Sequence, residues 1–260
     1  MANKIALITG ASTGIGRALA HQFSQNGFGL LLVARDLKRL ESVAEECRKI
    51  SLLPVTFVAL DLTDPFTASA IFDFSVERNL EIDVVVNNAG FGIHGEFSKT
   101  EIAKELELVR LQIDSFLQLT KLFLPQMRQR RYGHFLNIAS VYSFVPVPQQ
   151  AVYGACKSFM LSFSQSLASE VEPDGVSVTV VCPGVTQSEF RKRAGIREKK
   201  VESGMTAEAV AEQAFYAMRQ RRRILIPGFW NKFFIRLMWL LPSRGMTALM
   251  KAINQKRGVN

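Results

Sequence analysis

A chain of 260 residues is long enough to bury a large core, either as one α/β domain or as two small domains. Its composition, with 48% hydrophobic and 21% charged residues, is that of an ordinary globular protein, and no repeat or low-complexity segment indicates a solenoid or a disordered tail. The formal net charge of +9 favours an anionic partner, such as a phosphate-bearing cofactor, an acidic lipid surface or a nucleic acid.

The first predicted strand, residues 4–9, leads into the glycine-rich turn GASTGIG, and a helix follows. Glycines in such a turn let the backbone approach a pyrophosphate closely, while N–H groups at the helix N-terminus point at the phosphate oxygens. The positions of Gly10, Gly14 and Gly16 depart from the usual G-x-G-x-x-G spacing, but the physical requirement is the same. The segment therefore favours a dinucleotide site, and a plain tight turn is the alternative.

A second buried strand is predicted over residues 28–34, and Arg35 follows it. An acidic residue at this place binds the ribose 2′-hydroxyl of NAD, whereas an arginine can neutralise the extra 2′-phosphate of NADP. Arg35 therefore favours NADP. Asp36 could compete, although its position also suits a helix N-cap, and Arg39 could supply a second cation or face water.

Two further strands end in polar residues. The third, over residues 54–61, ends at Asp61, and the fourth, over residues 82–90, ends in the sequence NNAG. Four strands joined by helical crossovers predict a parallel, doubly wound sheet. Ligands of such sheets lie beyond the carboxyl ends of the strands, where Gly10, Asp61, Asn87 and Gly90 would all be found.

Several residues have the chemistry of helix ends. Asp64 and Pro65 suit the N-cap and the first position of the helix after the third strand. Ser98 and Glu101 have the spacing of a capping box for a long helix, in which Pro125 predicts a kink or a break.

A fifth strand, residues 133–140, ends at Ser140, and the next helix contains Tyr153 and Lys157. These two side chains are four residues apart, so they lie on one face of that helix. Such a pair means little alone, because chance produces it often. A sixth strand is predicted over residues 175–184 and ends in Pro-Gly.

The cysteines and histidines show no metal-ligand pattern. Cysteines at 47, 156 and 182 are scattered, which favours free thiols in a reducing compartment. The three histidines have no acidic or thiol companions at ligand spacing, so we expect no metal, although His94 could reach the cleft. The N-terminus leaves no room for a signal peptide before the first strand, and a cytoplasmic location is expected.

Over roughly residues 4–190, the chain resembles a classical short-chain dehydrogenase/reductase. The resemblance rests on the ordered set Thr9-Gly10-x-x-x-Gly14-Ile15-Gly16, Asp61, Asn87-Asn88-Ala89-Gly90, Ser140, Tyr153-x-x-x-Lys157 and Pro183-Gly184. It implies an α/β, Rossmann-type fold with one doubly wound parallel sheet of about seven strands, helices on both faces and a helical C-terminal extension. Residues 1–260 would form a single domain, with a cofactor-binding and catalytic core over 1–190 and a variable region over 191–260.

The resemblance also implies a mechanism and a set of site residues. Tyr153 would pass a proton to the substrate oxygen while hydride moves from the nicotinamide, Lys157 would lower the pKa of Tyr153 and bind the nicotinamide ribose, and Ser140 would hold the substrate oxygen. The implied cofactor-binding residues are Gly10, Ser12, Thr13, Gly14, Ile15, Gly16, Arg35, Arg39, Asp61, Leu62, Asn87, Ala89, Gly90, Tyr153, Lys157, Pro183, Gly184, Val185 and Ser188.

One position departs from the family pattern. The family commonly has an asparagine thirteen residues before the proline of its Leu-Pro, where it supports the active site, and here Leu124-Pro125 places Gln112 at that point. Glutamine keeps the amide group but adds a methylene. We therefore expect Gln112 to belong to the site with a shifted water relay.

The C-terminal region begins with a polar loop over residues 191–205 that could close over a ligand. A helix with Thr206 as its N-cap and a seventh strand over residues 221–228 follow. Only thirteen residues separate Gly228 from Pro242, and Lys232 and Arg236 interrupt them, whereas a membrane span needs about twenty apolar residues. Three interpretations stay open for this apolar segment: a packing or dimer helix, a lid over a lipophilic substrate, or an interfacial membrane anchor.

The resulting hypothesis is an NADP(H)-dependent oxidoreductase that acts on a carbonyl or secondary alcohol, in a lipophilic molecule such as an acyl chain, a steroid or a retinoid-like compound. We expect a dimer or tetramer, peripheral to a membrane surface if the apolar segment is an anchor. The alternative is a regulatory protein that keeps the nucleotide-binding fold without turnover, associated with a membrane surface or a partner. Nucleic acid is not expected, because the basic clusters lack interleaved aromatic residues.

Overall fold

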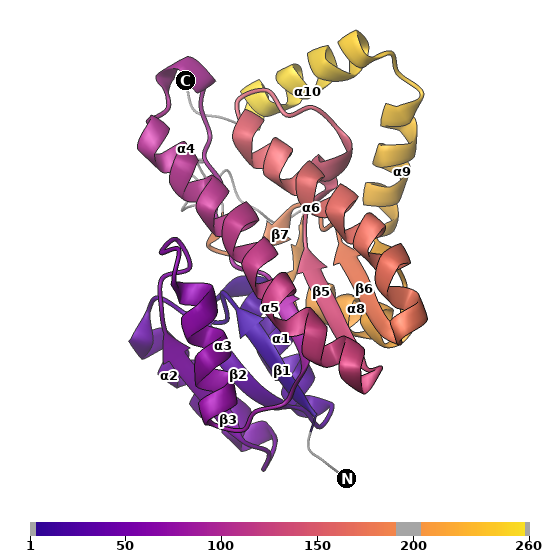
Figure 1. Ribbon diagram of the computed structural model, residues 1–260. Coiled ribbons are helices and arrows are strands. Elements are labelled where there is room, and N and C mark those ends of the chain that lie inside the picture. The colour runs from indigo at the N-terminus through magenta and orange to yellow at the C-terminus, as the bar shows by residue number, and fades with distance from the viewer. Residues whose placement is uncertain (1–3, 191–203, 258–260) are drawn as a thin grey trace.

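The computed structural model describes residues 4–190 and 204–257, and a seven-stranded parallel sheet lies at its centre (Figure 1). The strand order is β3-β2-β1-β4-β5-β6-β9. The strands are β1 (Ile5–Thr9), β2 (Gly29–Ala34), β3 (Val55–Ala59), β4 (Ile82–Asn87), β5 (Gly133–Ile138), β6 (Val176–Val181) and β9 (Ile224–Leu225). This order, in which the chain runs outward from β1 in both directions, confirms the predicted doubly wound, Rossmann-type sheet.

The sequence of the central strands explains their position. In β2, β4, β5 and β6 every residue is buried, and most of the side chains are valine, leucine or isoleucine. A parallel strand covered by helices on both faces has no solvent side, so its apolar residues form a continuous run rather than an alternating pattern.

Helices cover both faces of the sheet. On one face, α1 (Gly14–Gln25), α2 (Leu37–Ile50) and α8 (Ala207–Arg219) pack over one hydrophobic cluster. On the other, α3 (Thr67–Glu77), α5 (Ser115–Arg130) and α6 (Ala151–Val171) pack over a second cluster. Short 3-10 helices are found at η1 (Phe97–Lys99), η3 (Val141–Phe144) and η4 (Glu172–Asp174).

Two predicted helix caps are confirmed and one is wrong. The side chains of Asp36 and Thr206 accept hydrogen bonds from backbone N–H groups in the first turns of α2 and α8. Asp64 instead accepts a hydrogen bond from the N–H of Phe66 at 2.8 Å, and α3 begins only at Thr67. Asp64 therefore stabilises the turn before the helix, and Pro65 lies in that turn.

The capping box predicted at Ser98 and Glu101 is also wrong. Thr100 donates a hydrogen bond to Glu105 at 2.8 Å, and Glu101 precedes the helix without a side-chain cap. The long helix has three parts, α4 (Ile102–Val109), the π-helical segment η2 (Arg110–Asp114) and α5. Pro125 does not break it, because α5 continues to Arg130.

The strands β3, β4, β5 and β6 end two or three residues earlier than predicted. β3 and β5 stop two residues before Asp61 and Ser140, because each apolar run extends beyond the last residue that has a ladder partner. Both residues consequently lie in the loops at the carboxyl edge of the sheet. Beyond β6, β7 (Thr186–Gln187) pairs with β8 (Met205–Thr206), whereas most of the loop predicted to close over a ligand lies outside the described residues.

The C-terminal helices, α9 (Phe229–Trp239) and α10 (Ser243–Arg257), pack near the N-terminal end of α6 (Figure 1). Ile235, Met238 and Met250 are buried against the segment that leads into α6. The side chain of Asn231 on α9 lies directly against Gly184, which follows β6. No described helix is long and apolar enough to cross a membrane.

The helix position of Gly16 on α1 gives a stability prediction. A Cβ atom there would overlap the carbonyl oxygen of Gly10 and lie about as close to the amide of Asn88. Gly16→Ala should therefore lower the free energy of unfolding by about 2 kcal/mol or more, because the backbone of the loop after β1 cannot yield easily. Urea titration followed by circular dichroism measures this change.

Gly245 on α10 is the matched control, because it is also helical but has no atom within 4 Å of the added Cβ. Gly245→Ala should raise the free energy of unfolding by up to about 1 kcal/mol, as alanine is the better helix former. Equal effects of the two substitutions would show that the close approach at Gly16 does not limit stability.

Candidate active site

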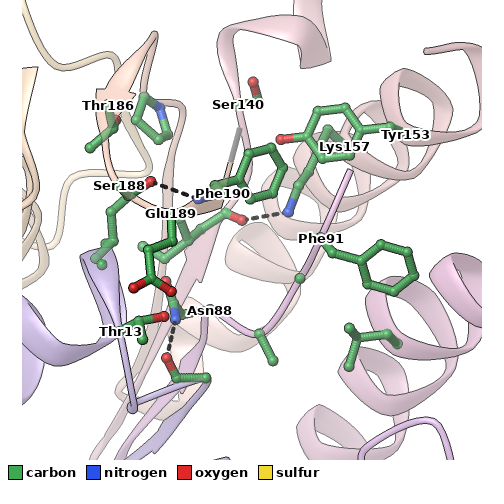
Figure 2. Close-up of a pocket in the computed structure, with 18 of the residues that line it drawn as sticks. Thr13, Asn88, Phe91, Ser140, Tyr153, Lys157, Thr186, Ser188, Glu189 and Phe190 are labelled. Carbon is green, nitrogen blue, oxygen red and sulfur yellow. Dashed lines mark hydrogen bonds between the residues drawn. The ribbon is translucent and has the colours of Figure 1, made fainter. Parts of the chain in front are cut away.

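A cavity of about 740 Å³ lies along the carboxyl edge of the sheet (Figure 2). Most residues that the sequence predicts for a site line this cavity, and they come mainly from the loops that follow β1 to β6. They are Gly10, Ser12, Thr13, Gly14, Ile15, Arg35, Arg39, Asp61, Leu62, Ala89, Gly90, Ser140, Tyr153, Lys157, Pro183, Gly184, Val185 and Ser188. Gly16, Asn87 and Gln112 do not line it.

Hydrogen bonds join the loop after β1 to the NNAG turn after β4. The hydroxyl of Thr9 accepts from the N–H groups of Asn88 and Ala89, at 3.0 and 3.1 Å, and donates to the carbonyl of Val86. The Asn88 amide in turn donates to the Thr9 carbonyl oxygen at 2.9 Å. The glycine loop is therefore held in place from below, and the residues from Ser12 to Ile15, at the N-terminus of α1, line the cavity.

Arg35 and Arg39 lie at this end of the cavity, each beside carboxylates. Arg35 is 3.5 Å from Asp61 and 3.6 Å from Glu107, and Arg39 forms a 2.7 Å ion pair with Glu189. Burial tends to raise the pKa of Asp61, but hydrogen bonds from Thr63 and the charge of Arg35 outweigh it, so the pKa lies below its ordinary value. Arg35 and Arg39 thus line the cavity while paired with carboxylates, and an anionic ligand would have to compete with these carboxylates for them.

At the other end, Ser140, Tyr153 and Lys157 lie side by side (Figure 2). Ser140 precedes η3, where its Oγ accepts a hydrogen bond from the N–H of Tyr142. The Nζ of Lys157 donates to the carbonyl oxygen of Ile138 at 2.9 Å and lies 5.7 Å from the centre of the Tyr153 ring. The end of β5 therefore fixes the position of the lysine, and α6 brings the phenol next to the serine.

Burial controls the protonation of both groups. It raises the pKa of Tyr153 well above its ordinary value, and a hydrogen bond with Ser140 offsets only part of that rise. Burial also lowers the pKa of Lys157 to about 8. In this structure the Lys157 amine donates to the Ile138 carbonyl, and burial has the largest effect on the pKa of the phenol. The role of Lys157 in lowering the pKa of Tyr153 stays a prediction.

The residues beneath the cavity are buried and polar. Asn87 donates to the Oδ1 of Asn137 at 2.9 Å, and Asn137 donates to Ser164 on α6. Gln112 lies in the π-helical segment η2, where its Nε2 donates to the carbonyl oxygen of Phe91 at 2.8 Å, while its Oε1 has no partner among the described residues. Gln112 thus supports the turn after β4 from below rather than facing the cavity.

The sequence interpretation missed several residues around Tyr153. Tyr142 and Phe190 pack against its ring, at centroid distances of 6.3 and 5.6 Å. Asn254 on α10 accepts a hydrogen bond from the Tyr142 hydroxyl and donates to Pro148, so the C-terminal helix forms part of the wall.

His94, which the sequence placed near the cleft, does line the cavity, and burial lowers its pKa. Asn88, part of the NNAG motif, lines the cavity as well. Phe91, Gln150 and Glu189 also line it, each within three residues of a predicted site residue.

The lowered pKa of Lys157 predicts a change of stability with pH. Between about pH 8 and 10 the folded protein releases this proton while the unfolded chain keeps it, so folding becomes more favourable as the pH rises. In Lys157→Met this contribution is absent. The free energy of unfolding of the wild type, measured relative to this variant, should therefore increase by about 2 kcal/mol from pH 7.5 to pH 10.

The control is Lys121→Met, which removes a lysine exposed on α5. Its stability should follow that of the wild type with pH. Parallel curves for the wild type and Lys157→Met would contradict the buried titration. Measurements stop at pH 10, since Tyr153 titrates above this point in the opposite sense.

Comparisons with known proteins agree with this geometry. A profile of the short chain dehydrogenase family matches residues 4–199. An uncharacterized oxidoreductase of Staphylococcus epidermidis is 30% identical over 217 residues, which are 84% of this chain and 91% of the relative.

Two solved structures are also similar. A short-chain dehydrogenase from Sphingobium yanoikuyae in complex with NADPH has a TM-score of 0.82 and 31% identity, with 91% of this chain and 94% of that one covered. A bulky-bulky ketone specific alcohol dehydrogenase from Comamonas testosteroni has a TM-score of 0.78 and 28% identity, with 92% and 94% covered. The chain therefore belongs to the short-chain dehydrogenase family of oxidoreductases.

Proposed function

We propose that this protein is an NADP(H)-dependent oxidoreductase that transfers hydride between the nicotinamide and a carbonyl or secondary alcohol of a lipophilic molecule. One observation supports this most directly: Ser140, Tyr153 and Lys157 converge at one end of a cavity whose other end is the glycine loop and Arg35. The volume of about 740 Å³ suits a ligand of drug size or larger.

The residues at the glycine-loop end fit a dinucleotide. Gly10 and Gly14 have φ angles of 64° and 55°, which favour glycine. A Cβ atom on Gly14 would lie 3.2 Å from the Cβ of Ser188, so a side chain there would take up space that a pyrophosphate needs. The first turn of α1 contains no acidic residue, so its N-terminus favours an anion. When bound, the cofactor supplies the hydride from its nicotinamide ring.

The protein's own groups handle the proton and the developing charge. Tyr153 donates its hydroxyl proton to the substrate oxygen, and Ser140 donates a hydrogen bond to the same oxygen. Lys157 lies close behind the tyrosine and would donate to the nicotinamide ribose. Because burial raises the pKa of Tyr153, the phenol is protonated at neutral pH, which suits the reduction of a carbonyl.

The walls near Tyr153 favour a lipophilic substrate. Phe91, Tyr142 and Phe190 pack around it in one apolar cluster. Few polar groups interrupt this wall, and those that do, such as His94 and Asn254, could orient a single oxygen of the substrate. The similar alcohol dehydrogenase from Comamonas testosteroni, named for bulky ketones, supports the same class of substrate. Assembly into a dimer or tetramer and a cytoplasmic location are part of the proposal.

A second candidate function is a regulatory protein that binds the nucleotide without turnover. The observation that favours it is Gln112, which makes one hydrogen bond with the backbone of Phe91 and leaves its Oε1 without a partner among the described residues. The intact group of Ser140, Tyr153 and Lys157 favours catalysis instead.

Replacing the phenol separates these two functions. Tyr153→Phe removes the proton donor and keeps the ring, so the rate of NADPH oxidation with an active carbonyl should fall by about 10²-fold or more, while NADPH binding is retained. A panel of short and long carbonyl compounds, followed by NADPH absorbance, measures the rate. Tyr132→Phe, which alters a tyrosine packed against His134 outside the cavity, should leave the rate unchanged. Unchanged turnover in Tyr153→Phe would remove the catalytic assignment.

The cofactor preference has a separate test. Arg35→Asp replaces a cation that lines the cavity by a carboxylate, so NADPH should bind at least about tenfold more weakly relative to NADH. Fluorescence titration of both nucleotides measures the ratio. Lys38→Asp makes the same change of charge on α2 at an exposed side chain that does not line the cavity, and it should leave the ratio unaltered. An equal ratio in Arg35→Asp and the wild type would contradict the preference for NADP.

A further inference from the structure

The outward side of α9 is an exposed apolar surface. The helix buries Ile235 and Met238 against the body of the protein. Its opposite side presents Phe229, Trp230, Phe233, Leu237 and the adjoining Leu240, and we call these five residues the α9 surface. Phe229, Trp230 and Leu240 are 74%, 76% and 81% exposed. A helix normally turns polar residues outward, so an apolar outer side indicates that something covers it.

The residues of the α9 surface form one continuous patch. Phe229, Phe233 and Leu237 are four residues apart, which places them in one row along the helix. Trp230 bridges this row, with ring centroids 5.7 Å from Phe229 and 6.2 Å from Phe233. The aromatic rings are therefore already packed against one another while their outer edges face solvent.

Basic residues border this patch, and the sequence of the C-terminal region that contains α9 and α10 is free of acidic residues. Lys232 and Arg236 are exposed next to the apolar row, and Arg244 is exposed at the start of α10. None of the three forms an ion pair within residues 4–190 and 204–257. From residue 213 to the C-terminus the sequence contains ten lysines and arginines and no aspartate or glutamate. Since the whole chain carries +9, this region accounts for its positive charge.

These charges decide between two kinds of partner. A second copy of the chain, docked through the same patch, would bring Lys232 and Arg236 of both subunits together, because a twofold interface uses the same surface twice. Like charges there are repulsive. An anionic lipid bilayer offers the opposite charge to the cations and an interfacial layer in which tryptophan and phenylalanine are stable.

We propose that the α9 surface binds an anionic lipid bilayer, with its aromatic side chains in the headgroup region and Lys232, Arg236 and Arg244 near lipid phosphates. The helix lies in the plane of the membrane surface and does not cross it. The binding does not depend on catalysis, so it is tested without substrate or cofactor and stands or falls separately from the proposed function.

The sequence provides its own reporter, because its two tryptophans, Trp230 and Trp239, are both on α9. Adding vesicles of phosphatidylcholine with about 30% phosphatidylglycerol to the full-length protein should shift tryptophan emission to shorter wavelength, and the protein should float with the vesicles. Pure phosphatidylcholine vesicles should produce a much smaller shift. No shift and no flotation with anionic vesicles at low salt would overturn the proposal.

Variants with matched controls test the surface itself. Lys232→Gln/Arg236→Gln should weaken binding to the anionic vesicles by about 30-fold, whereas Lys38→Gln/Lys49→Gln, which removes two exposed charges from α2, should leave it nearly unchanged. Phe229→Ser/Phe233→Ser should abolish binding, and Leu52→Ser/Phe66→Ser, at exposed apolar residues elsewhere, should not. Equal losses in test and control pairs would show nonspecific adsorption and overturn the proposal.

Sedimentation velocity without vesicles tests whether a second copy of the chain, rather than a membrane, covers the α9 surface. If Phe229→Ser/Phe233→Ser lowers the mass of the protein in solution, the α9 surface is an interface between copies and the proposal is wrong. An unchanged mass together with lost vesicle binding supports the membrane assignment. Circular dichroism of each variant checks that the total helix content is unchanged.

Discussion

The parallel direction of the strands brings the carboxyl ends of β1 to β6 to one edge of the sheet, and the cavity lies along this edge. Each strand adds one loop to the wall, so residues as distant in sequence as Gly10 and Ser140 become neighbours without any direct preference for each other. The central strands are buried on both sides, which fixes their register and therefore the position of every loop. Packing of the sheet thus determines the geometry of the site.

The site contains two ionisable groups that are shielded from water. Lys157 and Tyr153 are both buried, and burial favours the neutral form of each. The carbonyl of Ile138 compensates part of the loss of water around the amine. Burying the lysine lowers the stability of the fold at neutral pH. In return, Tyr153 is a protonated donor and Lys157 a weakly basic amine, and both lie where a bound ligand could change their protonation.

The sequence predicted the strands, the glycine loop and the cavity residues that lie next to motifs, because buried parallel strands produce long apolar runs and their loops carry the polar ends. It did not predict helix starts that depend on local competition, as when Thr100 bonds Glu105 and displaces the capping box at Ser98. The π-helical segment around Gln112 has no pattern in the sequence. Asn254 could not be found either, since only the packing of α10 brings it to Tyr142. Likewise Arg35 and Asp61 were both predicted for the site, but the sequence did not predict that they lie 3.5 Å apart or that Glu107 lies 3.6 Å from Arg35.

The contact between Asn231 and Gly184 has a consequence for regulation. Asn231 is on α9, its amide donates to Pro227, and its side chain leaves no space for a Cβ atom on Gly184, a residue of the cavity wall. Any partner that shifts α9 by a fraction of an ångström must therefore also shift that wall. Thermodynamic linkage makes such an effect reciprocal: a partner that shifts this contact alters the affinity of the cavity for its ligands, and a ligand in the cavity then alters the affinity of α9 for that partner by the same factor.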